Sequence, residues 1–214
     1  MPDLVLIGAS GLAREVAAAT SGTAWRTVGV LDDDAALHGS VVDGLDVLGG
    51  VDTAAERDEL LLVCIGAGAS RRTVVDRLAR LGVGVERYAT FIDSGVRIPA
   101  SVSIGPGSIV LAQSVLTTDI RVGAHVVLMP GVVLTHDDMV GDFVTLAAGV
   151  SIGGSVMLGA ESYLGMNASV RQRTTVGAGA TVGMGAAVLG DIPPGETWVG
   201  VPARRLTYAK GPTA

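Results

Sequence analysis

The chain has 214 residues, of which 49% are hydrophobic, 17% charged and 3% aromatic, and its formal net charge is -6. This length holds one large domain or two small ones, and an acidic chain with few aromatic residues is a poor candidate for a general nucleic-acid binder. No apolar run reaches the roughly 20 residues of a membrane-spanning helix, no secretion signal is apparent, and the single cysteine, Cys64, cannot form an internal disulfide, so we expect a cytoplasmic protein with no membrane or nucleic-acid partner.

Residues 1–88 have the sequence pattern of a small α/β domain. Short apolar runs that end in glycine or in acidic residues predict strands at 4–8, 27–34 and 60–68. Helical patterns separate these runs or follow them. Strands that alternate with helices in this way predict a parallel sheet with crossover connections.

Two segments of this domain predict helices. A glycine-rich turn after the first strand leads into the helical segment GASGLAREVAAAT at 8–20. Residues 70–82 form an amphipathic pattern, in which Val74, Leu78 and Leu81 are predicted to face inward and the arginines to face outward.

Residues 89–190 contain a six-residue repeat, which is the strongest pattern in the chain. A period of six fits neither a helix face nor an alternating strand, but it is typical of a hexapeptide β-helix, in which each unit forms one side of a coil. One aliphatic side chain per unit points into the narrow core. Residues 191–214, which begin DIPPGETWVGVPARRL, predict a C-terminal cap. The seventeen aliphatic positions are Ile92, Ile98, Ile104, Val110, Leu116, Val122, Leu128, Leu134, Val140, Leu146, Ile152, Leu158, Leu164, Val170, Val176, Val182 and Val188.

Polar residues interrupt the repeat at two places. The fifth residue of each unit is mostly small or β-branched and also turns inward, but Asp138 occupies this place in one unit. Asp138 either marks a local distortion or turns out to solvent. His125 occupies the fourth place of its unit, which usually faces solvent, and we interpret it as structural or incidental. His38, in the acidic loop after the second strand, could approach a substrate, but we favour a structural interpretation.

The chain resembles a known family of sugar acetyltransferases. The hexapeptide coil resembles the left-handed β-helix acyltransferases, and GASGLAREV and VGVLDDD are similar to the sialic-acid O-acetyltransferase and nucleotide-aminosugar N-acetyltransferase branch. The ending WVGVPARRL resembles the usual cap. The resemblance implies a Rossmann-like sugar-nucleotide domain followed by an all-β left-handed parallel β-helix. It also implies a homotrimer in which acetyl-CoA, the co-substrate, lies between the coils of adjacent subunits.

His136 is the candidate general base. It stands in LTHDDMVGDF, where the family carries a catalytic histidine followed by an acidic residue. A neutral imidazole accepts a proton near pH 7, and the carboxylate of Asp137 can orient the ring and stabilise its charged form. The resemblance also places an oxyanion-stabilising backbone N–H at Gly154, because glycine permits close approach. No metal is implied.

The coenzyme site is also placed by resemblance. Some aminosugar N-acetyltransferases carry a second histidine at the place of Thr145, whose hydroxyl can donate a hydrogen bond but cannot act as a base. A polyanionic coenzyme calls for local positive charge, and the late cluster Arg171, Arg173, Arg204, Arg205 and Lys210 is a candidate for phosphate contact. The implied wall of the coenzyme site consists of Thr145, Gly165, Met166, Gly183 and Met184.

The nucleotide-sugar site is expected at the carboxyl ends of the first strands. The turn GASG follows a strand and opens a helix, so its N–H groups suit a phosphate or a base edge. It lacks the full G-x-G-x-x-G fingerprint, and no bound NAD is predicted. Leu12 stands where relatives often have a histidine or another polar residue. By resemblance, the site consists of Ser10, Gly11, Leu12, Asp32, Asp33 and Gly66.

These features together predict an acetyl-CoA-dependent N-acetyltransferase that acts on a UDP- or dTDP-linked 4-amino-deoxysugar. O-acetylation of a sialic-acid-like sugar is an alternative, because a hydroxyl needs the same base and the same oxyanion donor. A non-catalytic scaffold that binds a sugar nucleotide is a second alternative. A γ-type carbonic anhydrase would need three histidine ligands, and the coil contains only His125 and His136.

Overall fold

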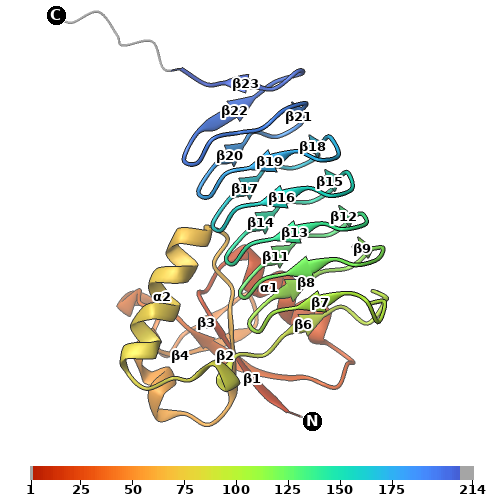
Figure 1. The fold of residues 1–214 in the computed structure, drawn as a ribbon. Coiled ribbons are helices and arrows are strands. Elements are labelled where there is room, and N and C mark those ends of the chain that lie inside the picture. Colours follow the sequence, from red (N-terminus) through yellow and green to blue (C-terminus); the bar gives the residue numbers. More distant parts are fainter. Residues whose placement is uncertain (1, 208–214) are drawn as a thin grey trace, which may run out of the picture.

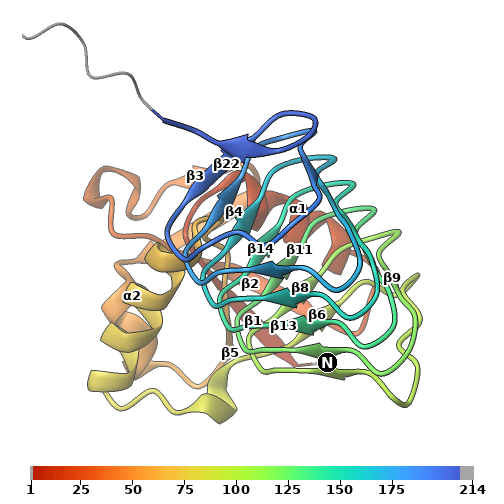
Figure 2. The same ribbon diagram turned by 45° about the horizontal axis from the view of Figure 1, so that its top comes forward.

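The structure, a computed structural model, describes residues 2–207 and has two parts. An α/β domain lies beside the lower half of a tall, three-sided parallel coil (Figures 1 and 2). This arrangement is the predicted fold class, which is confirmed. Among the described residues, no helix is long and apolar enough to cross a membrane.

The α/β domain is built on a five-stranded sheet with strand order β3-β4-β2-β1-β5, in which only the β3–β4 pair is antiparallel. The sequence predicted three of these strands and both α-helices. It did not predict the short 3-10 helices, nor β3 and β4, where glycines interrupt the apolar pattern between 39 and 50. The strands are β1 (Asp3–Ile7), β2 (Arg26–Leu31), β3 (Val41–Val42), β4 (Leu45–Gly49) and β5 (Leu60–Val63). The helices are α1 (Gly11–Thr20), α2 (Gly68–Arg80) and the 3-10 helices η1 (Ala35–Leu37), η2 (Val51–Glu56) and η3 (Val85–Arg87).

Side chains of β1 supply the core on both faces of this sheet. Leu4 and Leu6 pack with Val16 of α1, in a cluster that continues into coil residues such as Val127. Val5 and Ile7 pack on the other face, where α2 lies. The core therefore joins α1 to the coil. The predicted domain boundary between residues 88 and 89 stays a prediction. Tyr88 is the last residue before it and forms a β-bridge with Leu61 of β5.

Helix α2 differs from the prediction in its packing. Arg71 is completely buried against the coil instead of facing outward, whereas Leu81, predicted to face inward, is 47% exposed. The helix reaches the coil closely because Gly68 has no side chain; a Cβ there would collide with the carbonyl oxygen of Phe143. Arg72 forms an ion pair with Glu161 of the coil at 2.6 Å.

Apart from the cap strands β22 and β23, the coil consists of two-residue strands that stack into three parallel sheets, called sides here. Side one consists of β7 (Ser103–Ile104), β10 (Arg121–Val122), β13 (Met139–Val140), β16 (Met157–Leu158) and β19 (Thr175–Val176). Side two consists of β6 (Phe91–Ile92), β8 (Ile109–Val110), β11 (Val127–Leu128), β14 (Thr145–Leu146), β17 (Tyr163–Leu164), β20 (Thr181–Val182), β22 (Thr197–Val199) and β23 (Arg204–Arg205). Side three consists of β9 (Val115–Leu116), β12 (Val133–Leu134), β15 (Ser151–Ile152), β18 (Ser169–Val170) and β21 (Ala187–Val188).

The predicted aliphatic positions form the core of the coil. From Val110 to Val188 they are buried, and the first three, Ile92, Ile98 and Ile104, are partly buried and pack against the same cluster. The fourth place of most units turns the corner with a positive φ, as at His125 (53°) and Asp137 (64°). A corner residue in the left-handed conformation between successive two-residue strands is what closes the triangle.

Three edges separate the sides. Residues 124–125, 142–143 and 160–161 form the α2 edge, between sides one and two. Residues 130–131, 148–149, 166–167 and 184–185 form the methionine edge, between sides two and three. Residues 118–119, 136–137, 154–155 and 172–173 form the histidine edge, between sides three and one. The predicted cap follows, with β23 antiparallel to β22.

Candidate active site

The histidine edge carries the candidate base. Nδ1 of His136 lies 2.8 Å from Oδ2 of Asp137, and both side chains are more than half exposed. Because the carboxylate binds Nδ1, it favours the tautomer that carries the proton there and leaves Nε2 free to accept one from outside. The left-handed corner conformation of Asp137 is what brings its carboxylate back to the neighbouring ring.

Gly154 lies one coil above His136 on the same edge. The imidazole covers its Cα, so that a Cβ at residue 154 would collide with Nε2 and Cε1. Within residues 2–207, no protein acceptor takes the N–H of Gly154. The same place of the repeat holds Pro106 and Pro130 elsewhere, so the coil does not need this N–H. A free N–H beside a proton acceptor is the arrangement that acyl transfer requires.

Asp138, next to this pair, points into the coil and is 1% exposed. The solvent-facing alternative is therefore wrong. Burial raises the pKa of its carboxyl to about 6, although backbone N–H groups of Val156 and Thr135 donate to it and act in the opposite direction.

The predicted coenzyme wall divides between two places. Gly165, Met166, Gly183 and Met184 lie at the methionine edge, where the side chains of Met166 and Met184 are exposed. Thr145 lies apart from this edge and is buried on side two, although it lines one cavity together with Met166. Its hydroxyl donates to the carbonyl oxygen of Gly66 at 2.7 Å and accepts from Nη2 of Arg71 at 3.1 Å.

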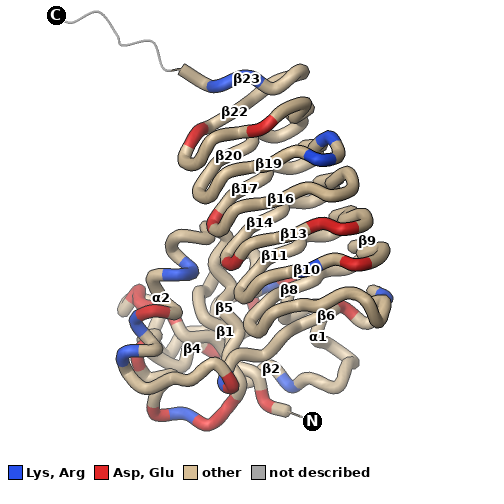
Figure 3. The backbone as a smooth tube through the Cα atoms, in the orientation of Figure 1, with Lys and Arg blue, Asp and Glu red and all other residues tan. Residues whose placement is uncertain are grey.

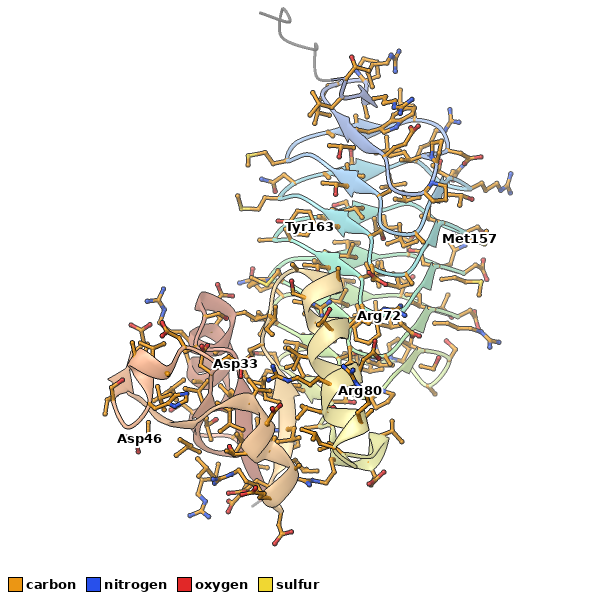
Figure 4. The ribbon with its side chains drawn as sticks, turned by 90° about the vertical axis from the view of Figure 1, so that its left-hand side faces the viewer. Asp33, Asp46, Arg72, Arg80, Met157 and Tyr163 are labelled. Atoms are coloured by element: carbon orange, nitrogen blue, oxygen red, sulfur yellow. The ribbon has the colours of Figure 1, made fainter. Side chains whose placement is uncertain are left out.

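A cavity of about 750 Å³ lies between helix α1 and side two of the coil. Its lining is mostly apolar and includes Leu12 from the predicted sugar site and Met166 from the predicted coenzyme wall. The phenol ring of Tyr163, which sequence reasoning did not single out, also lines it. Tyr163 projects from the coil above the domain that carries Asp33, while Met157 projects on the other side of the coil (Figure 4).

A second cavity, of about 300 Å³, brings together Ser10, Asp32, Asp33 and Gly66. Gly66 lines both cavities. Gly11, the first residue of α1, follows Ser10, whose side chain caps the helix by accepting from the N–H of Ala13. Most of the predicted nucleotide-sugar residues therefore lie around one hollow.

The two carboxylates in this hollow are already held by the protein. Oδ2 of Asp32 accepts the N–H of Ala9 at 2.7 Å, at the start of the glycine-rich turn. The guanidinium of Arg77 pairs with Asp33 and lowers the pKa of that carboxyl, since it stabilises the charged form. Arg77 was missed from the sequence because its partner lies 44 residues away.

His125 differs from its expected exposure. It is 4% exposed, lies under the α/β domain, and packs against Tyr88 and Phe143. Burial lowers the pKa of its imidazole to about 4. The structural interpretation of His125 agrees with this packing. Within the described part of the chain, no group of three or more histidine, cysteine, aspartate or glutamate side chains could hold a metal.

The histidine edge lies far from both cavities. In a triangular coil, side two is opposite the edge between sides three and one. In Figures 1 and 2 the α/β domain is on the left and the β9–β12 side of the coil is on the right. Acidic and basic stretches follow this right-hand edge of the coil (Figure 3). One chain therefore does not bring His136 to its own predicted sugar site.

Comparisons with known proteins identify the family to which this fold belongs. Residues 3–78 match the family described as the PglD N-terminal domain. The acetyltransferase domain of PglB from Neisseria gonorrhoeae FA1090, in complex with acetyl coenzyme A, has 31% sequence identity and a TM-score of 0.83, over 95% of this chain and 98% of that chain. A search of curated protein sequences returned no match.

Two further solved structures cover nearly the whole chain. A histidine-to-alanine mutant of GDP-perosamine N-acetyltransferase from Caulobacter crescentus, in complex with CoA and GDP-perosamine, has 25% identity and a TM-score of 0.86, over 97% of this chain and 98% of that one. WeeI from Acinetobacter baumannii AYE has 27% identity and a TM-score of 0.84, over 96% of this chain and 100% of that one.

The fold and the likeness to these proteins define the class, which is that of acyltransferases built on a left-handed parallel β-helix. Within it, the chain belongs to the family of hexapeptide-repeat sugar N-acetyltransferases that includes PglB. The predicted resemblance and enzyme class are confirmed, and the scaffold and carbonic anhydrase alternatives are set aside.

Proposed function

We propose that the protein transfers the acetyl group of acetyl-CoA to the amine of a nucleotide-linked 4-amino-deoxysugar, with UDP or dTDP as the nucleotide. The observation that carries this proposal is the His136–Asp137 pair lying against the backbone of Gly154 on an exposed edge. The acetyl-CoA in one relative, and the CoA and GDP-perosamine in another, support it.

In the proposed reaction, Nε2 of His136 takes a proton from the sugar amine as the amine nitrogen attacks the thioester carbonyl carbon. Asp137 orients the ring and stabilises the imidazolium that forms. The N–H of Gly154 donates to the carbonyl oxygen while it carries negative charge. The tetrahedral intermediate then expels CoA as a thiolate, which takes the proton from the imidazolium. The products are the N-acetylated sugar and CoA.

We place the coenzyme between the histidine edge of one copy and the methionine edge of a second copy. Met166 and Met184 offer exposed apolar surface to the coenzyme arm. Arg171 and Arg173 lie on the upper coils of the histidine edge and have no ion-pair partner among residues 2–207, so they are free for phosphate groups. Arg205 is paired with Glu196, and Lys210 lies outside the described residues.

The same geometry favours a homotrimer. The histidine edge supplies the base, while the two cavities that suit the sugar nucleotide lie toward the opposite side of the same coil. A site with both parts therefore needs a second copy. Three copies around an axis would repeat this heterologous contact and close it. The cytoplasm remains the proposed compartment, with the single cysteine buried and unpaired.

A panel of acceptors tests the reaction. We expect free thiol to appear from acetyl-CoA with one UDP- or dTDP-linked 4-amino-6-deoxysugar, and mass spectrometry to show the acetyl group on nitrogen. Turnover on a GDP-linked sugar alone would keep the reaction and overturn the choice of nucleotide. The control acceptor is the same sugar with a hydroxyl in place of the amine. Turnover on hydroxyl acceptors alone, including sialic-acid-like sugars, would replace this proposal with O-acetylation.

Mixing two inactive variants tests the shared site. His136→Ala removes the base, and Gly11→Asp puts a negative charge at the expected phosphate position, where a Cβ has open space. Each variant alone is expected to be inactive. Co-expressed at equal amounts, they should recover about a quarter of the wild-type activity, because random assembly pairs an intact base edge with an intact sugar site in that share of contacts. No recovery would mean that the site lies within one chain.

A further inference from the structure

Between Gly105 and Arg171, the hydrogen-bond ladder of the coil is broken at one position. The residue after each inward aliphatic donates its N–H to the carbonyl oxygen seventeen residues on, as Thr117 does to Leu134 and Gly153 does to Val170. From Gly105 to Arg171, every such place follows this rule except Thr135. Strand β12 accordingly pairs with β15 at one residue pair only, while it pairs with β9 at two.

Asp138 replaces the missing ladder bond. Its Oδ2 accepts the N–H of Thr135 at 2.9 Å, and its Oδ1 accepts the N–H of Val156, one coil above, at 3.0 Å. The hydroxyl of Thr135 donates to the carbonyl oxygen of Ile152 at 3.0 Å, at the acceptor that the ladder would have used. The backbone around Thr135 is thus held out of the regular register by side chains.

The coil itself does not need an aspartate at this place. The coils directly below and above have Ile120 and Val156 there, both completely buried. Ser108, at the same place in another unit, accepts one N–H of the next coil with a neutral hydroxyl. A buried carboxylate in this aliphatic column is costly, as the raised pKa of Asp138 indicates. An aspartate at this place therefore calls for a role that valine or serine could not fill.

The two bonds of Asp138 bracket the candidate catalytic groups. Thr135 and Asp138 lie on either side of His136 and Asp137, so the first bond closes the corner that carries the base. Val156 follows the corner that carries Gly154, so the second bond ties the two corners together. The ring of His136 and the backbone of Gly154 are in contact across this tie.

We propose that Asp138 is a positioning residue, whose carboxylate holds the His136 corner off the regular ladder and fixes the imidazole against Gly154. This inference rests on the proposed function of that pair. Asp138 touches neither substrate and acts through His136.

The test replaces Asp138 with the residue that the coil prefers. In Asp138→Val the N–H of Thr135 is free to bond with the carbonyl of Ile152. We expect kcat to fall about 10- to 100-fold, as for a small displacement of a catalytic group, with KM for both substrates changed less than about twofold. The melting temperature should stay the same or rise. Asp138→Ser can keep only the hydrogen bond from Val156, and its kcat should lie between those of the wild type and Asp138→Val.

Ser162→Val is the matched control. Ser162 occupies the same place of the repeat, is completely buried, and its hydroxyl has no partner among the described residues. This variant should also keep or raise the melting temperature but should leave kcat unchanged. If Asp138→Val keeps the wild-type kcat, or if its loss of activity follows a loss of folded protein, the positioning role is wrong.

Crystal structures of the wild type and of Asp138→Val separate this inference from the proposed function. We expect the variant to regain the Thr135–Ile152 bond and to show the ring of His136 displaced from Gly154. An unmoved ring would overturn the inference whatever the activity. If the wild type turns over no acceptor but the ring moves, the proposed function fails and the structural role of Asp138 stands.

Discussion

Replacing His136 with alanine is expected to lower kcat by about 10²–10⁴-fold, the usual contribution of a general base. The imidazole is exposed and has one protein partner, Asp137, so its removal costs the fold little. Without it, the attacking amine keeps its proton as the carbon–nitrogen bond forms. The measurement is the initial rate of thiol release at saturating acetyl-CoA with the acceptor that the panel identifies.

Gln172→Ala is the matched control for this variant. Gln172 lies on the same edge, two coils above His136, at the same place of the repeat and exposed. It should keep the wild-type kcat. A His136→Ala protein that turns over at the wild-type rate would show that the His136–Asp137 pair does not carry the chemistry.

Replacing Arg71 with methionine is expected to give the largest loss of stability, about 3–5 kcal/mol in the free energy of unfolding. The guanidinium is completely buried and donates to the carbonyl oxygens of Ile65 and Gly66 in the α/β domain. It also donates to carbonyl oxygens of the coil, those of His125, Phe143 and Val144. Methionine fills much of the volume, but among the described residues it leaves the carbonyl oxygens of Ile65, His125 and Phe143 without a donor. The carbonyls of Gly66 and Val144 keep one other donor each.

Urea unfolding measures this difference, and Arg80→Met is the control. Arg80 lies on the same helix, is exposed, and among the described residues its side chain donates only to the carbonyl oxygen of Asp76. It should stay within about 0.5 kcal/mol of the wild type. Since Arg71 also fixes the carbonyl groups at Gly66 beside both cavities, KM for the sugar nucleotide should rise in any Arg71→Met protein that folds. Equal stability of the two variants would contradict a stabilising role for the buried hydrogen bonds of Arg71.

The coil could be predicted from the sequence because its structure is local and repetitive. Each hexapeptide forms one side of a coil. The seventeen aliphatic positions therefore identify the inward-facing residues without reference to the rest of the chain. Residues eighteen apart share an edge, which is why His136 and Gly154 stack in the structure while Met166 and Met184 lie together on another edge.

The contacts between the two parts of the chain could not be predicted in this way. An arginine on a polar helix is predicted to be exposed. The coil atoms that accept hydrogen bonds from Arg71 lie 54 to 74 residues away in the sequence. His125 was assigned to solvent for the same reason, since the repeat does not reveal that the α/β domain covers that corner. Thr145 reads as a departure from relatives with histidine, whereas its hydroxyl is engaged between Gly66 and Arg71.

Asp138 lies between these cases. The repeat identified it as a departure at a particular place and offered distortion as one explanation. The missing bond of Thr135 supports that explanation, but only the backbone geometry shows which bond is replaced. The repeat shows that Asp138 departs from the pattern. The reason for this departure lies in its hydrogen bonds to the backbone of Thr135 and of Val156, one coil above.

The cap of the coil has a consequence for the solubility of the chain. A parallel ladder that simply stopped would present unpaired backbone groups, on which another coil could continue the stack. Here β23 folds back antiparallel on β22, so the direction of the last strand is reversed. Its two residues are Arg204 and Arg205, both exposed, and charged side chains on an edge strand disfavour pairing with a second copy. The reversed, charged strand therefore offers a poor template for end-to-end stacking of coils.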